Sequence, residues 1–283
     1  MKKILAVSGG IDSMVMLHLF RQEKDVIVAH FDHCIRENSA LDCAFVGRIA
    51  NDYQLAFYSE RVSLGESCSE SRARECRYAF LKRLCHTHHG EIYTAHHLDD
   101  LVESVTINLV RGTAWRGLTP LNGSNINRPL LSWTKRDIYR YATEHAIRFR
   151  LDSTNTDDRY LRNRIRSRLF SLSPDKLHQL ETDIFDLYQK QLTLSSGIEA
   201  IIESLTPKTP PYRKSIFLNS PENVAIELLR SVFKRHAVSL TIPQLSSCLD
   251  ALRTYSDNQL YSLDSSRFLK IGRYYFTITD QNI

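Results

Sequence analysis

The sequence lacks long apolar runs and paired cysteines, and both absences exclude classes of protein. No apolar stretch approaches the ~18 residues that span a bilayer, and the short run after Met1, Lys2 and Lys3 is typical of a strand rather than a signal peptide. The six cysteines have no C-x-x-C or other paired spacing. This favours free thiols in a reducing compartment over a disulfide framework. We therefore expect a cytoplasmic protein with no membrane partner.

Two common nucleotide-binding motifs are also missing. The chain contains neither G-x-x-x-x-G-K-[ST] nor G-x-G-x-x-G, which excludes a Walker loop with its phosphate-binding lysine and a dinucleotide fingerprint. What is present is typical of a folded protein, with 42% hydrophobic and 24% charged residues. The length of 283 residues exceeds an average domain of roughly 150 residues and favours two domains.

Positive charge is concentrated in one part of the chain. The formal net charge is +5, yet residues 128–168 contain eleven Lys and Arg against five Asp and Glu. Such a local excess is typical of a surface that binds a polyanion, and a solvated basic helix is the alternative. We interpret the segment as a nucleic-acid contact.

The first half of the chain alternates strand-like and helical patterns. Short apolar runs predict four buried strands, at Lys3–Val7, Asp25–Phe31, Leu55–Ser59 and Glu91–Ala95. Amphipathic segments predict five helices, at Ser13–Arg21, Ser39–Tyr53, Ser69–Thr87, Asp99–Arg111 and Thr134–Glu144. This succession predicts an α/β fold, an open parallel sheet with helices on both faces. Its ligands should bind beyond the carboxyl ends of the strands.

The second half of the chain has a different pattern. A further strand is predicted at Ile147–Leu151 and a long helix at Pro174–Ser204, before a proline-rich linker at residues 206–211. Two more helices and two alternating stretches that predict a terminal hairpin follow, at Pro221–His236, Ile242–Thr254, Gln259–Leu263 and Arg267–Thr279. We expect a catalytic domain over 1–172, a helical linker over 173–211 and a small, mostly helical C-terminal domain over 212–283.

A glycine-rich loop, Ser8-Gly9-Gly10-Ile11-Asp12-Ser13, joins the first strand to the first helix. Adjacent glycines permit positive φ and a close approach to a bulky anion, and a helix start presents free N–H groups. Ser8 and Ser13 add hydroxyl groups, and the Asp12 carboxylate suits Mg²⁺ held against phosphates. A tight glycine turn with a serine cap is the alternative, which the strand–loop–helix context disfavours.

The loop resembles the S-G-G-x-D-S signature of the PP-loop ATP pyrophosphatases, which have the fold of the adenine nucleotide alpha hydrolases. The resemblance implies that ATP, with Mg²⁺, is split between its α and β phosphates, so that AMP passes to a substrate oxygen and pyrophosphate leaves. It also implies ATP contacts for Ser8, Gly9, Gly10, Ile11, Asp12 and Ser13.

Further segments narrow the choice of family. They are His30-Phe-Asp-His33-Cys-Ile-Arg36, Glu70–Leu81, Ala95–Glu103, Leu109–Leu118 and Asp152–Arg166. In this order they resemble the tRNA(Ile)-lysidine synthetase family. The resemblance implies a ligase that adenylates the wobble cytidine of isoleucine tRNA with a CAU anticodon and then attaches L-lysine at C2. The modification changes codon reading from AUG to AUA.

The resemblance also implies roles for individual residues. Catalytic roles fall to Asp12, which also binds the metal, and to Asp100 and Glu103. Further ATP contacts fall to His33, Arg36, Arg111 and Gly112. Lysine contacts fall to Arg77, Asp100 and Glu103. Contacts with tRNA fall to Arg116, Arg159, Arg162, Arg164 and Arg166, together with the C-terminal domain. A homodimer is a further arrangement to test.

The residues themselves leave alternatives open for two of these groups. Asp99, Asp100 and Glu103 stand at helical spacings that let carboxylates converge on an amine or a metal, but acidic residues also favour any first helical turn. Arg77, three residues after Arg74, suits a ligand carboxylate, a phosphate or an ordinary surface ion pair.

One position departs from the family pattern, and two rival functions are open. Cys34 stands where the family usually has glycine, in H-x-x-H-G-L-R, so we expect an altered loop shape there. The nearest rival is a tRNA thiolase of the same superfamily, which the lack of C-x-x-C disfavours. A non-catalytic adenine-nucleotide-binding protein is the second, and it would leave the carboxylate and arginine segments without a purpose.

Overall fold

A computed structural model describes residues 1–34, 39–63, 69–123, 125–150 and 161–280. They form two compact units, Met1–Leu192 and Thr193–Ile283. Two of the predicted site residues, Arg36 and Arg159, lie outside the described residues, and Arg162 is described in its backbone alone.

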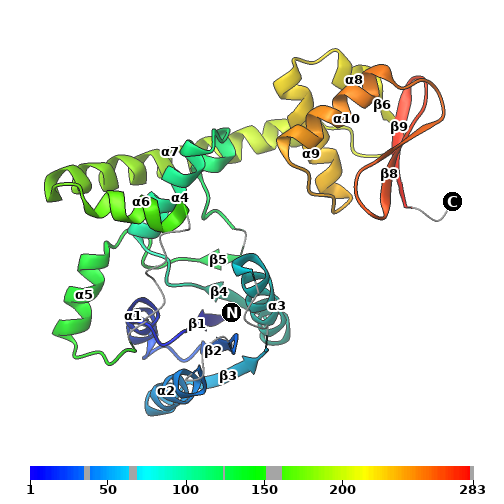
Figure 1. Ribbon diagram of the computed structural model, residues 1–283. Coiled ribbons are helices and arrows are strands. Elements are labelled where there is room, and N and C mark those ends of the chain that lie inside the picture. The colour runs from blue at the N-terminus through cyan, green and yellow to red at the C-terminus, as the bar shows by residue number, and fades with distance from the viewer. Residues whose placement is uncertain (35–38, 64–68, 124, 151–160, 281–283) are drawn as a thin grey trace. The chain divides into compact units, whose positions relative to one another are not determined.

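The first unit is built on a parallel sheet of five strands in the order β3-β2-β1-β4-β5 (Figure 1). The strands are β1 (Lys2–Ala6), β2 (Val26–Asp32), β3 (Ala56–Arg61), β4 (Gly90–Tyr93) and β5 (Ile126–Asn127). Leu5 of β1 lies beside Val28 of β2 and Tyr93 of β4, so these three strands end at one edge of the sheet. The four predicted strands are confirmed, with ends shifted by one or two residues.

Helices cover both faces of this sheet, which confirms the predicted fold class. On one face are α1 (Ile11–Phe20), α2 (Ser39–Asp52) and α5 (Lys135–Glu144), and on the other is α3 (Glu70–His88). Successive side chains of a strand point to opposite faces. Leu5 therefore packs with Met14 and Val46, whereas Ile4 packs with Phe80.

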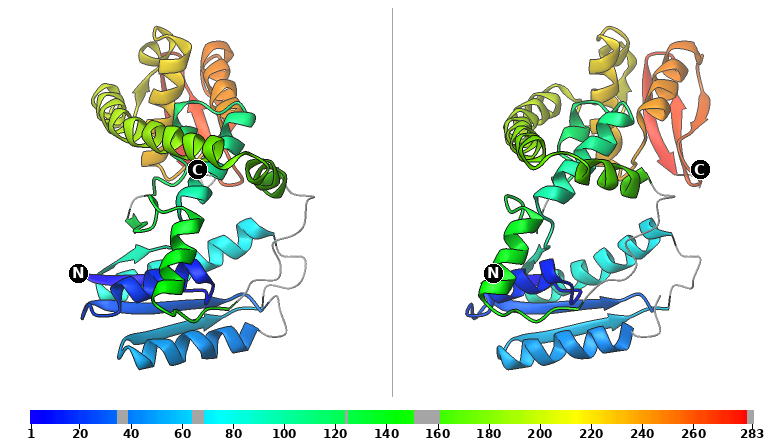
Figure 2. Two further views of the ribbon diagram at one scale, coloured as in Figure 1. Left: turned by 90° about the vertical axis from the view of Figure 1, so that its left-hand side faces the viewer. Right: turned by 60° about the vertical axis from the view of Figure 1, so that its left-hand side comes forward.

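Three more α-helices lie wholly or partly in the first unit, together with a short 3-10 helix, η1 (Trp115–Leu118). α4 (Leu98–Val110) buries Leu101 and Val105 against α7 (Pro174–Leu205), and α6 (Leu161–Phe170) contacts α4. In Figure 2, α4, α6 and the first half of α7 lie together, on the side of the unit away from α2 and β3. The long helix predicted over Pro174–Ser204 is confirmed. None of the described helices combines the length and the apolar character that crossing a membrane requires.

The strand predicted at Ile147–Leu151 is wrong over its described residues. Residues 147–150 form no strand, and the place beside β4 is taken by β5, which has only two residues. Ile147 and Phe149 pack against the core beneath α1 and α5, so their apolar character reflects packing against helices. A two-residue strand carries no alternating pattern that could have predicted it.

The second unit packs three helices on an antiparallel sheet in the order β6-β9-β8-β7. Its elements are β6 (Tyr212–Arg213), α8 (Lys214–Leu218), α9 (Glu222–Arg235), α10 (Ile242–Thr254), β7 (Gln259–Ser262), β8 (Arg267–Ile271) and β9 (Tyr275–Asp280). Helices α9 and α10 confirm the prediction. The predicted hairpin forms, with β7 antiparallel to β8. The second stretch, Arg267–Thr279, is two strands rather than one, because the chain turns back at Gly272, whose N–H donates to the Tyr275 carbonyl at 2.8 Å.

Candidate active site

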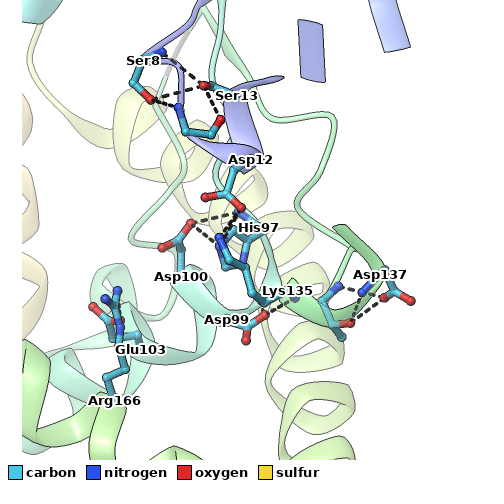
Figure 3. Close-up of polar contacts among 12 residues, drawn as sticks. Ser8, Asp12, Ser13, His97, Asp99, Asp100, Glu103, Lys135, Asp137 and Arg166 are labelled. Atoms are coloured by element: carbon cyan, nitrogen blue, oxygen red, sulfur yellow. Dashed lines mark hydrogen bonds and ion pairs between the residues drawn. The ribbon is translucent and has the colours of Figure 1, made fainter. Parts of the chain in front are cut away.

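The glycine-rich loop forms the turn between β1 and α1. Gly9 has φ +95°, and a Cβ there would lie 3.4 Å from Cγ2 of Val46, so the turn favours a residue without a side chain. The Ser13 hydroxyl accepts hydrogen bonds from the N–H groups of Ser8 and Gly9, both at 3.2 Å, and donates to the Gly10 carbonyl at 2.9 Å (Figure 3). The N-cap of α1 is Gly10, which has no side chain to accept a hydrogen bond, so N–H groups of the first turn can donate to an anion.

A cavity of about 560 Å³ opens in front of this loop, at the carboxyl edge of the sheet. Its walls come from the loop, from the ends of β2 and β4 and from α3, and include Ser8, Asp12, His33, Arg77 and His96. The strand order runs from β1 to β2 on one side and to β4 on the other. The cavity therefore lies at the switch point of the sheet, where open parallel sheets bind ligands, and its volume suits a nucleotide.

Asp12 belongs to a cluster of charged side chains at the edge of this cavity (Figure 3). Its Oδ1 forms an ion pair with Nζ of Lys135 and lies 3.9 Å from Nε2 of His97. The same Nε2 atom lies 3.6 Å from Oδ2 of Asp100, and the other ring nitrogen, Nδ1, lies 3.3 Å from Oδ2 of Asp99. The cluster thus joins the first turns of α1, α4 and α5.

Hydrogen bonds and charge hold the carboxylates of this cluster in place. Asp100 Oδ2 accepts the His97 N–H at 3.1 Å, and Asp99 Oδ2 accepts the Lys135 N–H at 2.8 Å. Burial disfavours a charged His97, but the carboxylates of Asp99, Asp100 and Asp12 outweigh it and raise the pKa of the ring. Burial likewise disfavours a charged Asp99, yet contacts with His97 and the Lys135 N–H lower its pKa. The His97 ring therefore lies between three carboxylates, which favour its protonated form.

His96, the adjacent residue, has the opposite electrostatic environment. Burial lowers its pKa to about 4, opposed by Asp100 and assisted by the guanidinium groups of Arg128, Arg74 and Arg77. The ring is therefore neutral at physiological pH. Around it are one carboxylate, that of Asp100, and three guanidinium groups. Such surroundings suit a ligand that carries a positive and a negative group.

Arg128 is a half-buried cation whose Nε atom is itself buried. Its Nη1 donates to the Ile126 carbonyl at 3.2 Å, while its Nε has no hydrogen-bond partner among the described residues. Burial lowers the pKa of this guanidinium. Nearby, Nη2 of Arg74 donates to the Tyr78 hydroxyl at 3.3 Å. An anionic ligand would compensate the positive charge gathered on this side of the cavity.

Glu103 lies apart from the other two carboxylates of α4. Its side chain is 3% exposed, and its Oε2 accepts hydrogen bonds from Nε of Arg166 at 3.0 Å and Nη2 at 2.8 Å. The structure therefore brings Asp99 and Asp100 together at His97, while Glu103 pairs with α6 one turn further along α4 (Figure 3).

The end of β2 contributes two histidines with different surroundings. His30 is buried, and its Nδ1 lies 2.9 Å from the Val7 carbonyl, a bond that joins β2 to the end of β1. The ring of His33 lines the cavity, and burial together with Arg77 lowers its pKa. A neutral His33 can accept or donate one hydrogen bond to a bound ligand.

Other predicted residues lie away from the phosphate loop. Arg111 and Gly112 follow the far end of α4, a 13-residue helix that spans roughly 20 Å. The guanidinium of Arg116 stacks on Trp115, with 4.2 Å between guanidinium carbon and ring centroid, and Arg164 is exposed on α6. The structure thus does not bring Arg111 and Gly112 to the loop.

A family model described as the PP-loop domain matches residues 1–173. The chain belongs to the PP-loop family. The matched region contains the whole sheet of the first unit, the glycine-rich loop and every residue that lines the cavity in front of it.

Curated relatives confirm the resemblance to the lysidine synthetase family. The chain is 32% identical to the tRNA(Ile)-lysidine synthase of Thermotoga sp. (strain RQ2), over 82% of this chain and 60% of the relative. It is 28% identical to the bifunctional protein TilS/HprT of Listeria monocytogenes serovar 1/2a, over 97% of this chain and 46% of the relative. The chain thus spans about half the length of these relatives.

A solved structure shares the fold. The U34-tRNA thiolase NcsA from Methanococcus maripaludis superposes with a TM-score of 0.56 at 18% identity, over 68% of this chain and 72% of that protein. At this level of identity the similarity concerns the arrangement of the sheet and helices.

Cys34 adopts the backbone conformation that favours glycine. Its φ is +54°, in the left-handed region. Its N–H donates to Asp32 Oδ1 at 2.8 Å, and its Sγ accepts from Nε of Arg61 at 2.9 Å. The cysteine thus takes the left-handed turn that a glycine would take, at a cost of about 1 kcal/mol.

Cys34→Gly should therefore raise the free energy of unfolding of this PP-loop protein by about 1 kcal/mol, because glycine enters the left-handed region without a steric penalty. Urea denaturation followed by circular dichroism measures the change. Cys34→Ala is the matched control, since it removes the sulfur contact with Arg61 but keeps the strain. An equal gain in the alanine variant would contradict the explanation.

Several residues of the PP-loop site were missed by sequence reasoning. His97 and Lys135 join the Asp12 cluster, and Arg128 lies near His96. The helix predicted over Thr134–Glu144 is confirmed, and a capping box formed by Thr134 and Asp137 begins it, which places Lys135 in the first turn. Its partner lies 123 positions earlier in the chain, and no local pattern reports such a contact.

Proposed function

We propose that this PP-loop protein uses ATP to adenylate the wobble cytidine of CAU-anticodon tRNA(Ile) and then joins L-lysine to C2, forming lysidine. The observation that carries the proposal is the single cavity that combines a phosphate loop with separated cationic and anionic groups, Arg77 on one wall and the Asp12 cluster on another. The names of the relatives favour this reaction over others of the family.

The nucleotide would bind with its phosphates at the loop. The N–H groups at the start of α1 donate to phosphate oxygens, and the apolar side chains of Ala29, Phe31 and Leu81 provide walls for the adenine ring. Mg²⁺ in nucleotide sites is commonly held by one or two carboxylates together with phosphates and water. The Asp12 carboxylate beside the loop fits that pattern, and when bound the ion would neutralise charge on the departing pyrophosphate.

In the first step the cytidine O2 attacks the α-phosphorus of ATP. The bond from this phosphorus to the bridging oxygen breaks, and the oxygen leaves with the electron pair as part of pyrophosphate. In this proposal the protein positions the reactants and stabilises the charge on the phosphates. The loop holds the phosphates, and the cluster around His97 keeps Asp12 oriented toward them.

In the second step the ε-amine of lysine attacks C2 of the adenylated base, and AMP leaves. We assign the lysine carboxylate to Arg77, a cation that lines the cavity, and the amine to Asp100, whose carboxylate lies beside His97 in the Asp12 cluster. The amine must lose a proton to react, and in this proposal Asp100 accepts it. Glu103 would contribute once its contact with Arg166 is exchanged for the lysine amine.

The tRNA would bind along the basic segment of the first unit. Arg164 is exposed on α6, and Arg116 together with Trp115 presents a guanidinium and an aromatic ring side by side. Arginines contact phosphates without reading sequence, and aromatic rings stack on unpaired bases such as those of an anticodon loop. The C-terminal unit supplies a second tRNA contact in this proposal.

The decisive experiment is a labelling assay with the full chain, ATP, Mg²⁺, radiolabelled L-lysine and unmodified tRNA(Ile) with a CAU anticodon. We expect lysine to enter the tRNA with one AMP and one pyrophosphate released for each lysine attached. The matched control is the same tRNA with a GAU anticodon, which lacks the cytidine and should remain unlabelled. Absence of label in the CAU substrate would refute the proposal.

The same assay separates the two rival functions. A thiolase would release pyrophosphate with this or another tRNA only when a sulfur donor is supplied, and lysine would stay free. A non-catalytic nucleotide-binding protein would bind ATP and release no pyrophosphate with any tRNA.

A further inference from the structure

The PP-loop carries no lysine, yet the fold places one beside it. In the sequence the loop lacks the phosphate-binding lysine of a Walker motif. In the structure Nζ of Lys135 forms an ion pair with Oδ1 of Asp12, in the first turn of α1 (Figure 3). A cation from α5 therefore lies at the loop, although 123 positions separate the two residues.

The start of α5 is held firmly, so this cation is presented from a rigid element. Thr134 and Asp137 form a capping box, in which the Thr134 N–H donates to Asp137 Oδ2 at 3.0 Å. The Lys135 N–H donates to Asp99 Oδ2 at 2.8 Å. One turn further, Ile138 is fully buried in the core under α1. These bonds fix the backbone of Lys135 and do not involve its ammonium group. The ammonium can therefore exchange Asp12 for another anion.

The ion pair itself contributes little to folding. The side chains of Lys135 and Asp12 are 30% and 31% exposed, and pairs this exposed are weak and screened by salt. Because α5 is already anchored through Ile138 and Ala142, the pair is not needed to dock the helix. Its position beside the phosphate loop calls for another explanation.

We propose that Lys135 is the phosphate-binding lysine of this site: it neutralises Asp12 before the nucleotide arrives and then donates hydrogen bonds to the β- and γ-phosphate oxygens of ATP. This inference rests on the proposed function. When the bond from the α-phosphorus to the bridging oxygen breaks, the electron pair moves onto pyrophosphate. The Lys135 ammonium stabilises that charge and keeps its own proton.

Arg150 is another cation beside the loop and provides a comparison. Its N–H donates to the Gly9 carbonyl at 2.9 Å, and its guanidinium is paired with Asp42 of α2. Asp42 lies on the wall formed by α2, whereas Asp12 belongs to the loop itself. Lys135 is therefore the cation whose partner lies where the phosphates should bind.

The test compares the binding of ATP and AMP by calorimetry, with Mg²⁺ and in EDTA, for wild type, Lys135→Met and Lys135→Arg. We expect Lys135→Met to weaken ATP binding ten- to a hundredfold and AMP binding less than about twofold, because AMP lacks the phosphates that the ammonium contacts. Lys135→Arg should retain most of the preference for ATP. Arg140→Gln is the matched control, an exposed position on the same helix.

Further readouts keep the outcomes distinct. The melting temperature of Lys135→Met should change by less than about 3 °C, and ATP-dependent pyrophosphate release should fall about a hundredfold. If wild type prefers ATP over AMP and Lys135→Met keeps the same preference, the inference is overturned while the proposed function stands. It is also overturned if Arg150→Met alone removes the preference. Failure of wild type to bind ATP would overturn the proposed function together with the inference.

Discussion

Asp12→Asn is expected to reduce ATP-dependent pyrophosphate release by at least about a thousandfold and to leave tRNA binding intact. The substitution keeps the size of the side chain but removes its negative charge. In the structure that charge lies at the phosphate loop, and under the proposed function it holds Mg²⁺ against the phosphates. Loss of one electrostatic contact to a developing charge costs two to three orders of magnitude in rate, and a metal contact costs more.

Release of pyrophosphate in a single turnover measures this effect, and filter binding of labelled tRNA measures the affinity. Asp25→Asn is the matched control, because Asp25 precedes β2 at the opposite edge of the same sheet and pairs with Lys2 on the surface. Unchanged release in Asp12→Asn would remove Asp12 from the metal-binding and catalytic roles. Loss of tRNA binding as well would indicate damage to the fold rather than to the site.

Arg166→Met is expected to lower the free energy of unfolding by about 3 kcal/mol. The guanidinium donates two hydrogen bonds to Glu103, whose side chain is 3% exposed, and its removal takes both bonds and one positive charge from a buried carboxylate. Urea denaturation measures the loss. Arg164→Met is the matched control on the same helix. Its side chain is exposed, so its removal should change stability by less than about 0.5 kcal/mol.

A double variant tests the cause of this loss. Glu103→Leu combined with Arg166→Met replaces both charged partners by apolar groups and should recover most of the stability, because the buried carboxylate is then removed together with its arginine. If the double variant is no more stable than Arg166→Met alone, the pair is not what holds α6 against α4.

The same variants separate the two roles predicted for Arg166. If Arg164 contacts a tRNA phosphate, Arg164→Met should weaken tRNA binding without lowering the free energy of unfolding. The affinity for tRNA should then also fall less steeply with salt concentration. Arg166 is occupied by Glu103, so its substitution should act mainly through stability. The ion pair thus joins Glu103, a residue predicted to bind lysine, to α6, a helix of the first unit predicted to bind tRNA.

The order of elements in the first unit could be predicted from the sequence because the signals are local. The strand at Val26–Asp32 is a compact apolar run, and the capping box at Thr134 marks the start of α5. The phosphate loop was equally accessible, since two glycines between a strand and a helix permit few other structures. The prediction of strands failed in two places. β5 was missed because it has only two residues, and residues 147–150 were predicted as a strand because Ile147 and Phe149 are apolar, although they pack against helices without pairing with another strand.

By itself, the sequence determined that this chain has a parallel α/β domain with a phosphate loop and that it belongs among PP-loop proteins. Only the tertiary structure decided which charges meet. His97 lies among Asp12, Asp99 and Asp100, Lys135 reaches the loop from α5, and Glu103 pairs with Arg166. The physical reason is that periodicity and capping act over a few residues, whereas an ion pair depends on how whole helices pack across the sheet.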